Sequence, residues 1–169
     1  MSTIFVTEAV MLAIYGQLLT PPRPVEYIIP YTTILELYEL SSSDEPLMHT
    51  PADDQHVRTK INELIHYFEE PLNKKKIDKA LQTPWAKSPS IPVGERTVVI
   101  VMNAIDHAPY GELFDPVETE LLAAAARLSV PLLTDQYELI QRMISAEVPV
   151  QVFDIDDFDF ALDDDAAQV

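Results

Sequence analysis

The sequence predicts an α/β protein with three layers, in which helices cover both faces of a mainly parallel sheet of about five strands. Between residues 115 and 154, helical patterns alternate with short apolar runs, and almost no residues are left for long connections. Such short apolar runs are typical of parallel strands that are buried on both faces. The run from 97 to 102, Thr-Val-Val-Ile-Val-Met, is continuous and rich in β-branched residues, as expected of a central strand.

The first half of the chain contains two strands and a helical hairpin in this interpretation. Residues 25–29 follow a proline-rich stop, and a cap at Thr32 or Thr33 begins the next helix. A polar, proline-containing segment predicts a flexible loop over residues 41–55. The expected order is strand 3–6, helix 8–19, strand 25–29, helix 34–40, loop 41–55, helices 56–68 and 71–81, and an irregular connection over 83–95.

The second half alternates strands and helices more regularly. The remaining strands are expected at residues 97–102, 130–133 and 149–153, with one helix beginning near Asp115 and another near Asp135. Right-handed crossover connections then place helices on both faces of one sheet.

Length and composition favour one intracellular domain. The 169 residues are enough for a core of their own, so we expect a single domain over 1–153 and an acidic C-terminal tail over 154–169. No apolar run has the length of a membrane span, which predicts no membrane partner. The first twenty residues lack a basic segment and a small-residue cleavage site, which favours a cytoplasmic location. The absence of cysteine excludes disulfides and thiolate metal sites.

Four acids stand near the expected ends of strands or the starts of helices: Glu8, Glu36, Glu118 and Asp135. In parallel sheets, ligands bind beyond the carboxyl ends of the strands. Carboxylates that converge there repel one another unless a cation is present, so we expect Mg²⁺ or Mn²⁺. Two such ions activate a water molecule and stabilise the leaving oxygen of a phosphodiester.

The segments that carry a family resemblance are Ile29-Pro30 with Glu36, Glu118 with Ala123–Ala126, Pro131–Asp135, and Val148-Pro149-Val150. Together they resemble the PIN-domain family of metal-dependent ribonucleases, which includes the toxin nucleases of bacterial toxin–antitoxin pairs. The resemblance implies a PIN-like fold, an RNA substrate and Mg²⁺ or Mn²⁺ as cofactor. Glu36, Glu118 and Asp135 would be the catalytic metal ligands, with Glu8 as a fourth ligand.

Two positions depart from the family pattern. Thr7 stands where the family has an aspartate at the end of the first strand, and Glu8 is its neighbour. Gln136 stands where a later family acid is expected, and Asp135 lies one place before it. The acidic site that the resemblance implies is therefore incomplete.

Helix capping offers a second interpretation of the same acids. Asp115-Pro116-Val117-Glu118 has the pattern of a capping box with proline at the first helical position. The segments 135–138 and 33–36 repeat the spacing of that motif. Glu8 would favour its helix through the helix dipole. Both interpretations are compatible with helices that begin at strand ends.

Charge is distributed unevenly along the chain. The net charge is −17, and residues 105–169 contain two basic and fifteen acidic residues. A surface this negative repels nucleic acid over roughly a Debye length, about 8 Å at physiological salt. Nonspecific binding of DNA or RNA is therefore disfavoured.

The tail alternates acids with large apolar residues between 152 and 165. It predicts an edge strand that frays at the terminus, a docking peptide for a basic protein partner with Phe158 and Phe160 as anchors, or an internal competitor that occupies a nucleic-acid groove. An exposed tail and an exposed helical hairpin also suggest a homodimer.

Two functional hypotheses follow from the sequence. The first is a PIN-like ribonuclease that uses Mg²⁺ or Mn²⁺ in an incomplete acidic site. The second is a catalytically inactive PIN-like module that acts as a protein-binding or regulatory protein. Thr7, Gln136 and the net charge favour the second hypothesis, and the remaining acids favour the first.

Overall fold

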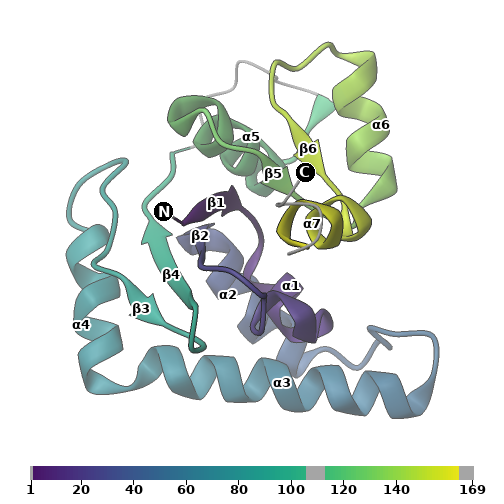
Figure 1. Cartoon of the computed structure of the whole chain (residues 1–169). Coiled ribbons are helices and arrows are strands. Elements are labelled where there is room, and N and C mark those ends of the chain that lie inside the picture. Colours follow the sequence, from purple (N-terminus) through teal and green to yellow (C-terminus); the bar gives the residue numbers. More distant parts are fainter. Residues whose placement is uncertain (1, 106–112, 164–169) are drawn as a thin grey trace.

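The computed structural model of the protein describes residues 2–105 and 113–163. In these residues the strands are β1 (Thr3–Val6), β2 (Val25–Pro30), β3 (Ile91–Pro92), β4 (Thr97–Met102), β5 (Leu132–Leu133) and β6 (Val152–Phe153). They form one sheet in the order β3-β4-β2-β1-β5-β6 (Figure 1). Every neighbouring pair is parallel except β3 and β4. The predicted α/β class and the mainly parallel sheet are therefore confirmed.

The helices of the described residues are α1 (Ala9–Ile14), α2 (Tyr31–Ser42), α3 (Pro51–Glu69), α4 (Pro71–Ala80), α5 (Pro116–Leu128), α6 (Tyr137–Ser145) and α7 (Ile155–Leu162). A short 3₁₀ helix, η1 (Gly16–Leu18), follows α1. Within residues 2–105 and 113–163, none of the helices combines the length and apolar character that a membrane span requires.

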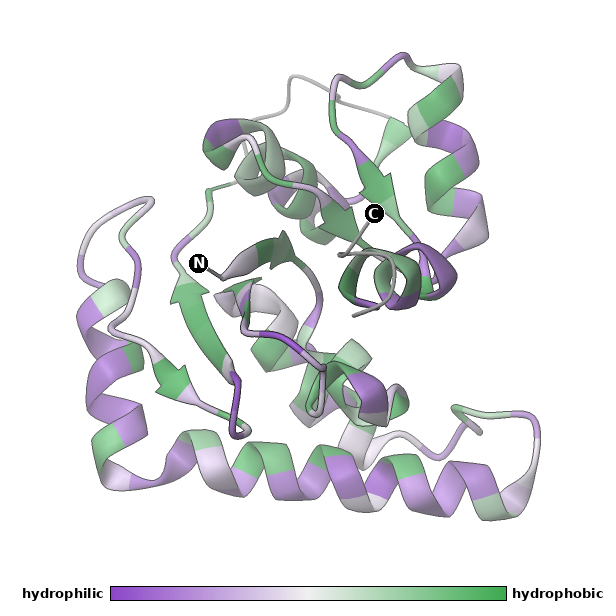
Figure 2. Ribbon diagram, in the orientation of Figure 1, coloured by the Kyte–Doolittle hydropathy of each residue, from purple (hydrophilic) through white to green (hydrophobic). Residues whose placement is uncertain are grey.

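Helices cover both faces of the sheet. Successive residues of a strand point to opposite faces, so each face contributes its own apolar side chains to a core. Phe5 and Tyr27 belong to an apolar cluster with buried side chains of α1, α2, α3 and α7. Their neighbours Val6 and Ile28 belong to a second cluster with α5 and α6. Figure 2 shows that the strands are largely apolar, whereas the long helix α3 alternates apolar and polar residues. The result is a three-layer α/β/α arrangement.

Several elements differ from the expected boundaries. The strands expected over 130–133 and 149–153 are limited to Leu132–Leu133 and Val152–Phe153. The helix expected over 8–19 is interrupted at Tyr15, whose backbone is extended, and continues as η1. The loop expected over 41–55 is shorter, because Thr50 caps α3 by accepting a hydrogen bond of 3.1 Å from the backbone N–H of Asp53. The connection over 83–95 contains β3, an edge strand in which Pro92 is tolerated because strand edges need fewer hydrogen bonds.

Residues 155–162 form a helix rather than an edge strand or a free tail. Asp154 begins α7 with a capping box, accepting a hydrogen bond of 2.8 Å from the backbone N–H of Asp157. Phe158 is 1% exposed and packs against the rings of Phe5 and Tyr27, with centroid distances of 5.4 and 6.4 Å. The part of the predicted tail that the structure describes is thus packed onto the core, and residues 164–169 lie outside the described residues.

Candidate functional site

The four acids predicted as site residues gather at the edge where the parallel strands end. Glu8 lies two residues after β1 and Asp135 two residues after β5, while α2, which contains Glu36, follows β2 directly. Burial, followed by the negative charges of Glu36, Asp135, Asp115 and Glu118, raises the pKa of Glu8 to about 7. The structure therefore brings Glu36, Glu118, Asp135 and also Asp115 within electrostatic reach of Glu8.

Glu8 is a buried carboxyl group with an amide partner. Its side chain accepts a hydrogen bond of 2.6 Å from the Nε2 of Gln136. Thr7, at the other position that departs from the family pattern, donates its hydroxyl to the backbone oxygen of Leu133 at 2.9 Å. The neutral side chains of Thr7 and Gln136 thus tie the end of β1 to the end of β5 and the segment that follows it.

Glu118 is neutralised by an arginine. The two guanidinium nitrogens of Arg142 on α6 each donate a hydrogen bond of 2.7 Å to the two carboxylate oxygens of Glu118. These bonds, together with one from the backbone N–H of Asp115, lower the pKa of Glu118 despite its burial. A bidentate pair of this kind fixes both geometry and charge.

The capping interpretation holds for one of its three segments. Asp115 and Glu118 form the predicted capping box at the start of α5. By contrast, α6 begins after Gln136 without a side-chain cap, and Asp135 instead accepts a hydrogen bond of 2.7 Å from the hydroxyl of Tyr15. The capping interpretation of Asp135 is therefore wrong.

Glu36 also has no capping role. The residue at the N-terminus of α2 is Pro30, and no side chain caps this helix. Thr33, the expected cap, donates to the backbone oxygen of Pro30 and accepts from the backbone N–H of Ala9. Partial burial and the charges of Asp115, Glu39 and Glu120 raise the pKa of Glu36. Glu120, which Thr32 contacts by a short hydrogen bond, adds a further buried acid at this edge.

The fit of these residues to a divalent metal is poor. In the described part of the chain, no group of three or more His, Cys, Asp or Glu side chains is arranged to hold a metal ion. Carboxylate oxygens are the right ligands for Mg²⁺ or Mn²⁺, and Glu8, Glu36 and Asp135 would have to supply them. Glu118 is not counted among them, because both of its carboxylate oxygens accept hydrogen bonds from Arg142.

Sequence reasoning missed Arg142, Gln136 and Tyr15 as partners of the acids. Arg142 gave a usable signal, because it is one of two basic residues after position 104 and stands among fifteen acids. An isolated cation in such a segment predicts a specific carboxylate partner. Tyr15 and Gln136 carry no comparable signal, since their contacts depend on how β1 and β5 lie side by side.

Of the two aromatic residues predicted as partner anchors, only Phe160 presents its ring to solvent. Phe160 is 73% exposed, whereas Phe158 is buried in the core. Phe158 therefore cannot serve as an anchor for a partner while α7 remains folded.

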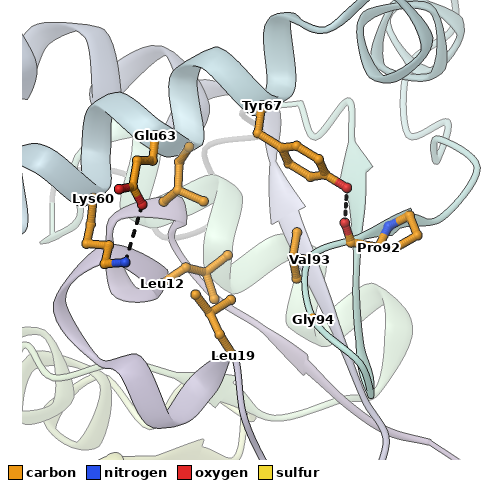
Figure 3. Close-up of a pocket in the computed structure, with 9 residues that line it drawn as sticks. Leu12, Leu19, Lys60, Glu63, Tyr67, Pro92, Val93 and Gly94 are labelled. Atoms are coloured by element: carbon orange, nitrogen blue, oxygen red, sulfur yellow. Dashed lines mark hydrogen bonds and ion pairs between the residues drawn. The ribbon is translucent and has the colours of Figure 1, made fainter.

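A separate cavity of about 420 Å³ lies away from the acids, near the start of β4. Figure 3 shows its apolar lining, with Leu12 and Leu19 from the α1–η1 segment and Val93 from the turn before β4. Lys60 and Glu63 of α3 form an ion pair of 3.3 Å beside it, and the hydroxyl of Tyr67 donates to the backbone oxygen of Pro92. The cavity shares no residue with the acidic edge.

Comparison of the sequence with known proteins gives no match, either to a protein-family model or to a curated protein. The functional interpretation therefore rests on the residues and the geometry of this chain.

Proposed function

We propose that this chain is a PIN-like module that acts by binding a protein partner rather than by cleaving RNA. The observation that carries the proposal is the bidentate contact between Arg142 and Glu118. This contact holds the guanidinium of Arg142 against Glu118, which the family resemblance implies is a metal ligand.

A metal ion would have to compete with this arginine. Glu118 uses both oxygens for Arg142, and its side chain is only 10% exposed. Displacing the guanidinium would leave it without its carboxylate partner, which is costly for partly buried ion pairs.

The surface is better suited to proteins than to RNA. The net charge of −17 opposes phosphate backbones, and the segment after position 104 carries most of it. Large apolar side chains are exposed on helices, among them Leu72 at 66%, Ile144 at 65% and Phe160 at 73%. Where such side chains lie together within a polar rim, they form the kind of patch that protein partners bind.

Calorimetric titration with Mn²⁺ tests the proposal. We expect no saturable heat for the full chain, and the same result for the Glu36→Gln and Glu118→Gln variants. Glu63→Gln, which removes an exposed acid of α3, is the matched control for the loss of one negative charge. Saturable heat in the original chain that disappears in both site variants but persists in Glu63→Gln would overturn the proposal.

A second candidate function is the Mg²⁺- or Mn²⁺-dependent ribonuclease. The observation in its favour is the convergence of Glu8, Glu36, Glu118 and Asp135 at one edge, which the electrostatic coupling to Glu8 records. In that case Glu36, Glu118 and Asp135 would hold the metal and Glu8 would replace the family's aspartate. The metal, when bound, would activate water for attack on a phosphodiester. Mn²⁺ binding as described above, together with RNA cleavage that Glu36→Gln abolishes, would support this candidate.

A further inference from the structure

A groove of about 310 Å³ opens between α6 and the segment that leads through β6 into α7. Figure 1 shows α6 on the outer side of β6, with α7 following that strand. The groove is lined by six aliphatic side chains: Ile140, Met143, Ile144, Val148, Val150 and Val152. Of these, Met143 is buried and the other five are partly or largely exposed.

Helix α6 has more apolar surface than the core uses. Leu139 and Met143 are buried beneath it, and Arg142 reaches to Glu118. Ile140 and Ile144, one turn apart, line the groove instead, and Ile144 is 65% exposed. Side chains four residues apart form a continuous row on a helix. The helix therefore presents an aliphatic row to solvent.

The surroundings of the groove are strongly negative. Asp154 and Asp157 complete its lining, and both are exposed. Their capping hydrogen bonds to each other's backbone leave the negative charges in place, since a carboxylate has further acceptor capacity. Residues 135–163 contain eight acids and a single base, Arg142, which is paired with Glu118.

We infer that this groove docks a basic amphipathic helix of a partner protein. The apolar side of that helix fills the hollow over Ile140 and Ile144, and its Lys or Arg side chains lie against Asp154 and Asp157. The volume is at the low end of small-molecule sites, roughly 300 to 1,000 Å³, and suits a few side chains. Apolar anchors within a charged surround are the usual basis of helix-in-groove recognition. This inference rests on the proposed protein-binding function and specifies its partner.

The first experiment uses a synthetic probe. A fluorescent peptide of about 18 residues, with Leu on one helical face and Lys on the other, is titrated with the full chain and followed by anisotropy. A peptide of the same composition in scrambled order has the same charge but no apolar face. We expect the amphipathic peptide to bind at least about tenfold more tightly than the scrambled one. Equal binding of the two peptides would overturn the inference, because charge alone would then explain it.

Matched substitutions locate the site. Ile144→Ser should weaken binding of the amphipathic peptide by about tenfold, because it removes an anchor contact in the groove. Leu72→Ser is the control, since Leu72 lies on α4 and has nearly the same exposure, 66% against 65%. Asp154→Asn should weaken binding and reduce its salt dependence, while asparagine keeps the helix cap. Circular dichroism establishes that each variant is folded.

Three further results would contradict the inference: no binding of the amphipathic peptide, an equal loss in Leu72→Ser and Ile144→Ser, or self-association of the chain that Ile144→Ser abolishes. The last result, measured by sedimentation, would make a second copy the occupant. The Mn²⁺ titration is independent of the groove. If the chain binds both Mn²⁺ and the amphipathic peptide, the proposed function is overturned and the inference about the groove stands. If it binds neither Mn²⁺ nor the peptide, the inference about the groove is overturned and the proposed function stands.

Discussion

Glu8 is an ionisable side chain that the fold buries among other carboxylates. Burial, followed by the charges of Glu36 and Asp135, raises its pKa from 4.5 to about 7. Between these two pH values the folded protein keeps a proton that the unfolded chain has released. The free energy of unfolding therefore falls as the pH rises through this window, and the fall ends above about pH 7. A pKa change of this size corresponds to roughly 3 kcal/mol.

The Glu8→Gln variant tests this dependence. Glutamine stays neutral and can keep the hydrogen bond from Gln136. We expect the variant to gain roughly 2 to 3 kcal/mol over the original chain between about pH 5 and about pH 8, measured by urea unfolding. Glu63→Gln, at an exposed position, should gain nothing over this range. A constant difference between Glu8→Gln and the original chain at all pH values would contradict the prediction.

The pair of Arg142 and Glu118 makes a second prediction for single residues. In a double-mutant cycle of Arg142→Gln and Glu118→Gln, we expect a coupling energy of about 1 to 3 kcal/mol in urea unfolding. We expect no larger coupling energy because the Arg142 side chain is 38% exposed, so that solvent screens the pair. Arg127→Gln is the control, because Arg127 lies over the ring of Trp85, with its Cζ 4.6 Å from the centroid. Coupling between Arg127 and Glu118 as large as that of Arg142 would indicate a general charge effect.

At the scale of elements, patterns of neighbouring residues predicted most of the sheet but not its short pieces. The run 97–102 is apolar and β-branched throughout, and it is β4 without change of boundary. Ile91-Pro92 was missed as a strand because it is short and contains a proline, and only its pairing with β4 defines it. Contacts between distant positions were likewise the part of the site that local patterns could not predict. The gathering of the acids follows from parallel strands, whereas the partners Arg142, Gln136 and Tyr15 come from distant positions.

Helix α7 makes the third prediction. Its two phenylalanines are two residues apart, and Phe158 is 1% exposed whereas Phe160 is 73% exposed. Phe158→Ala should lower the free energy of unfolding by about 3 to 5 kcal/mol, because it leaves a cavity in the core. Phe160→Ala should change it by less than about 0.5 kcal/mol. Equal, small effects in urea unfolding would mean that α7 is detached from the core in solution.

At the scale of the whole molecule, negative charge is concentrated in the last third of the chain. Residues 105–169 carry fifteen acids and two bases, and the described part of this segment contains α5, α6 and α7. Both of its bases are engaged, Arg142 with Glu118 and Arg127 with Trp85. The fifteen acids far outnumber these two arginines, so carboxylates dominate the long-range field of this segment. Such a field attracts basic partners and destabilises the compact state through self-repulsion.

The fourth prediction separates this diffuse field from a specific metal site. Raising the NaCl concentration should raise the melting temperature gradually, because screening weakens the repulsion among the acids. Mg²⁺ should act in the same gradual way when compared at equal ionic strength, since Glu118 is already paired with Arg142. A specific site would instead stabilise the fold in proportion to its occupancy, and the effect would saturate. Scanning calorimetry of the original chain and of Glu36→Gln distinguishes the two cases. A saturating rise with Mg²⁺ in the original chain that is absent in Glu36→Gln would show that the acids at the strand ends bind a metal after all.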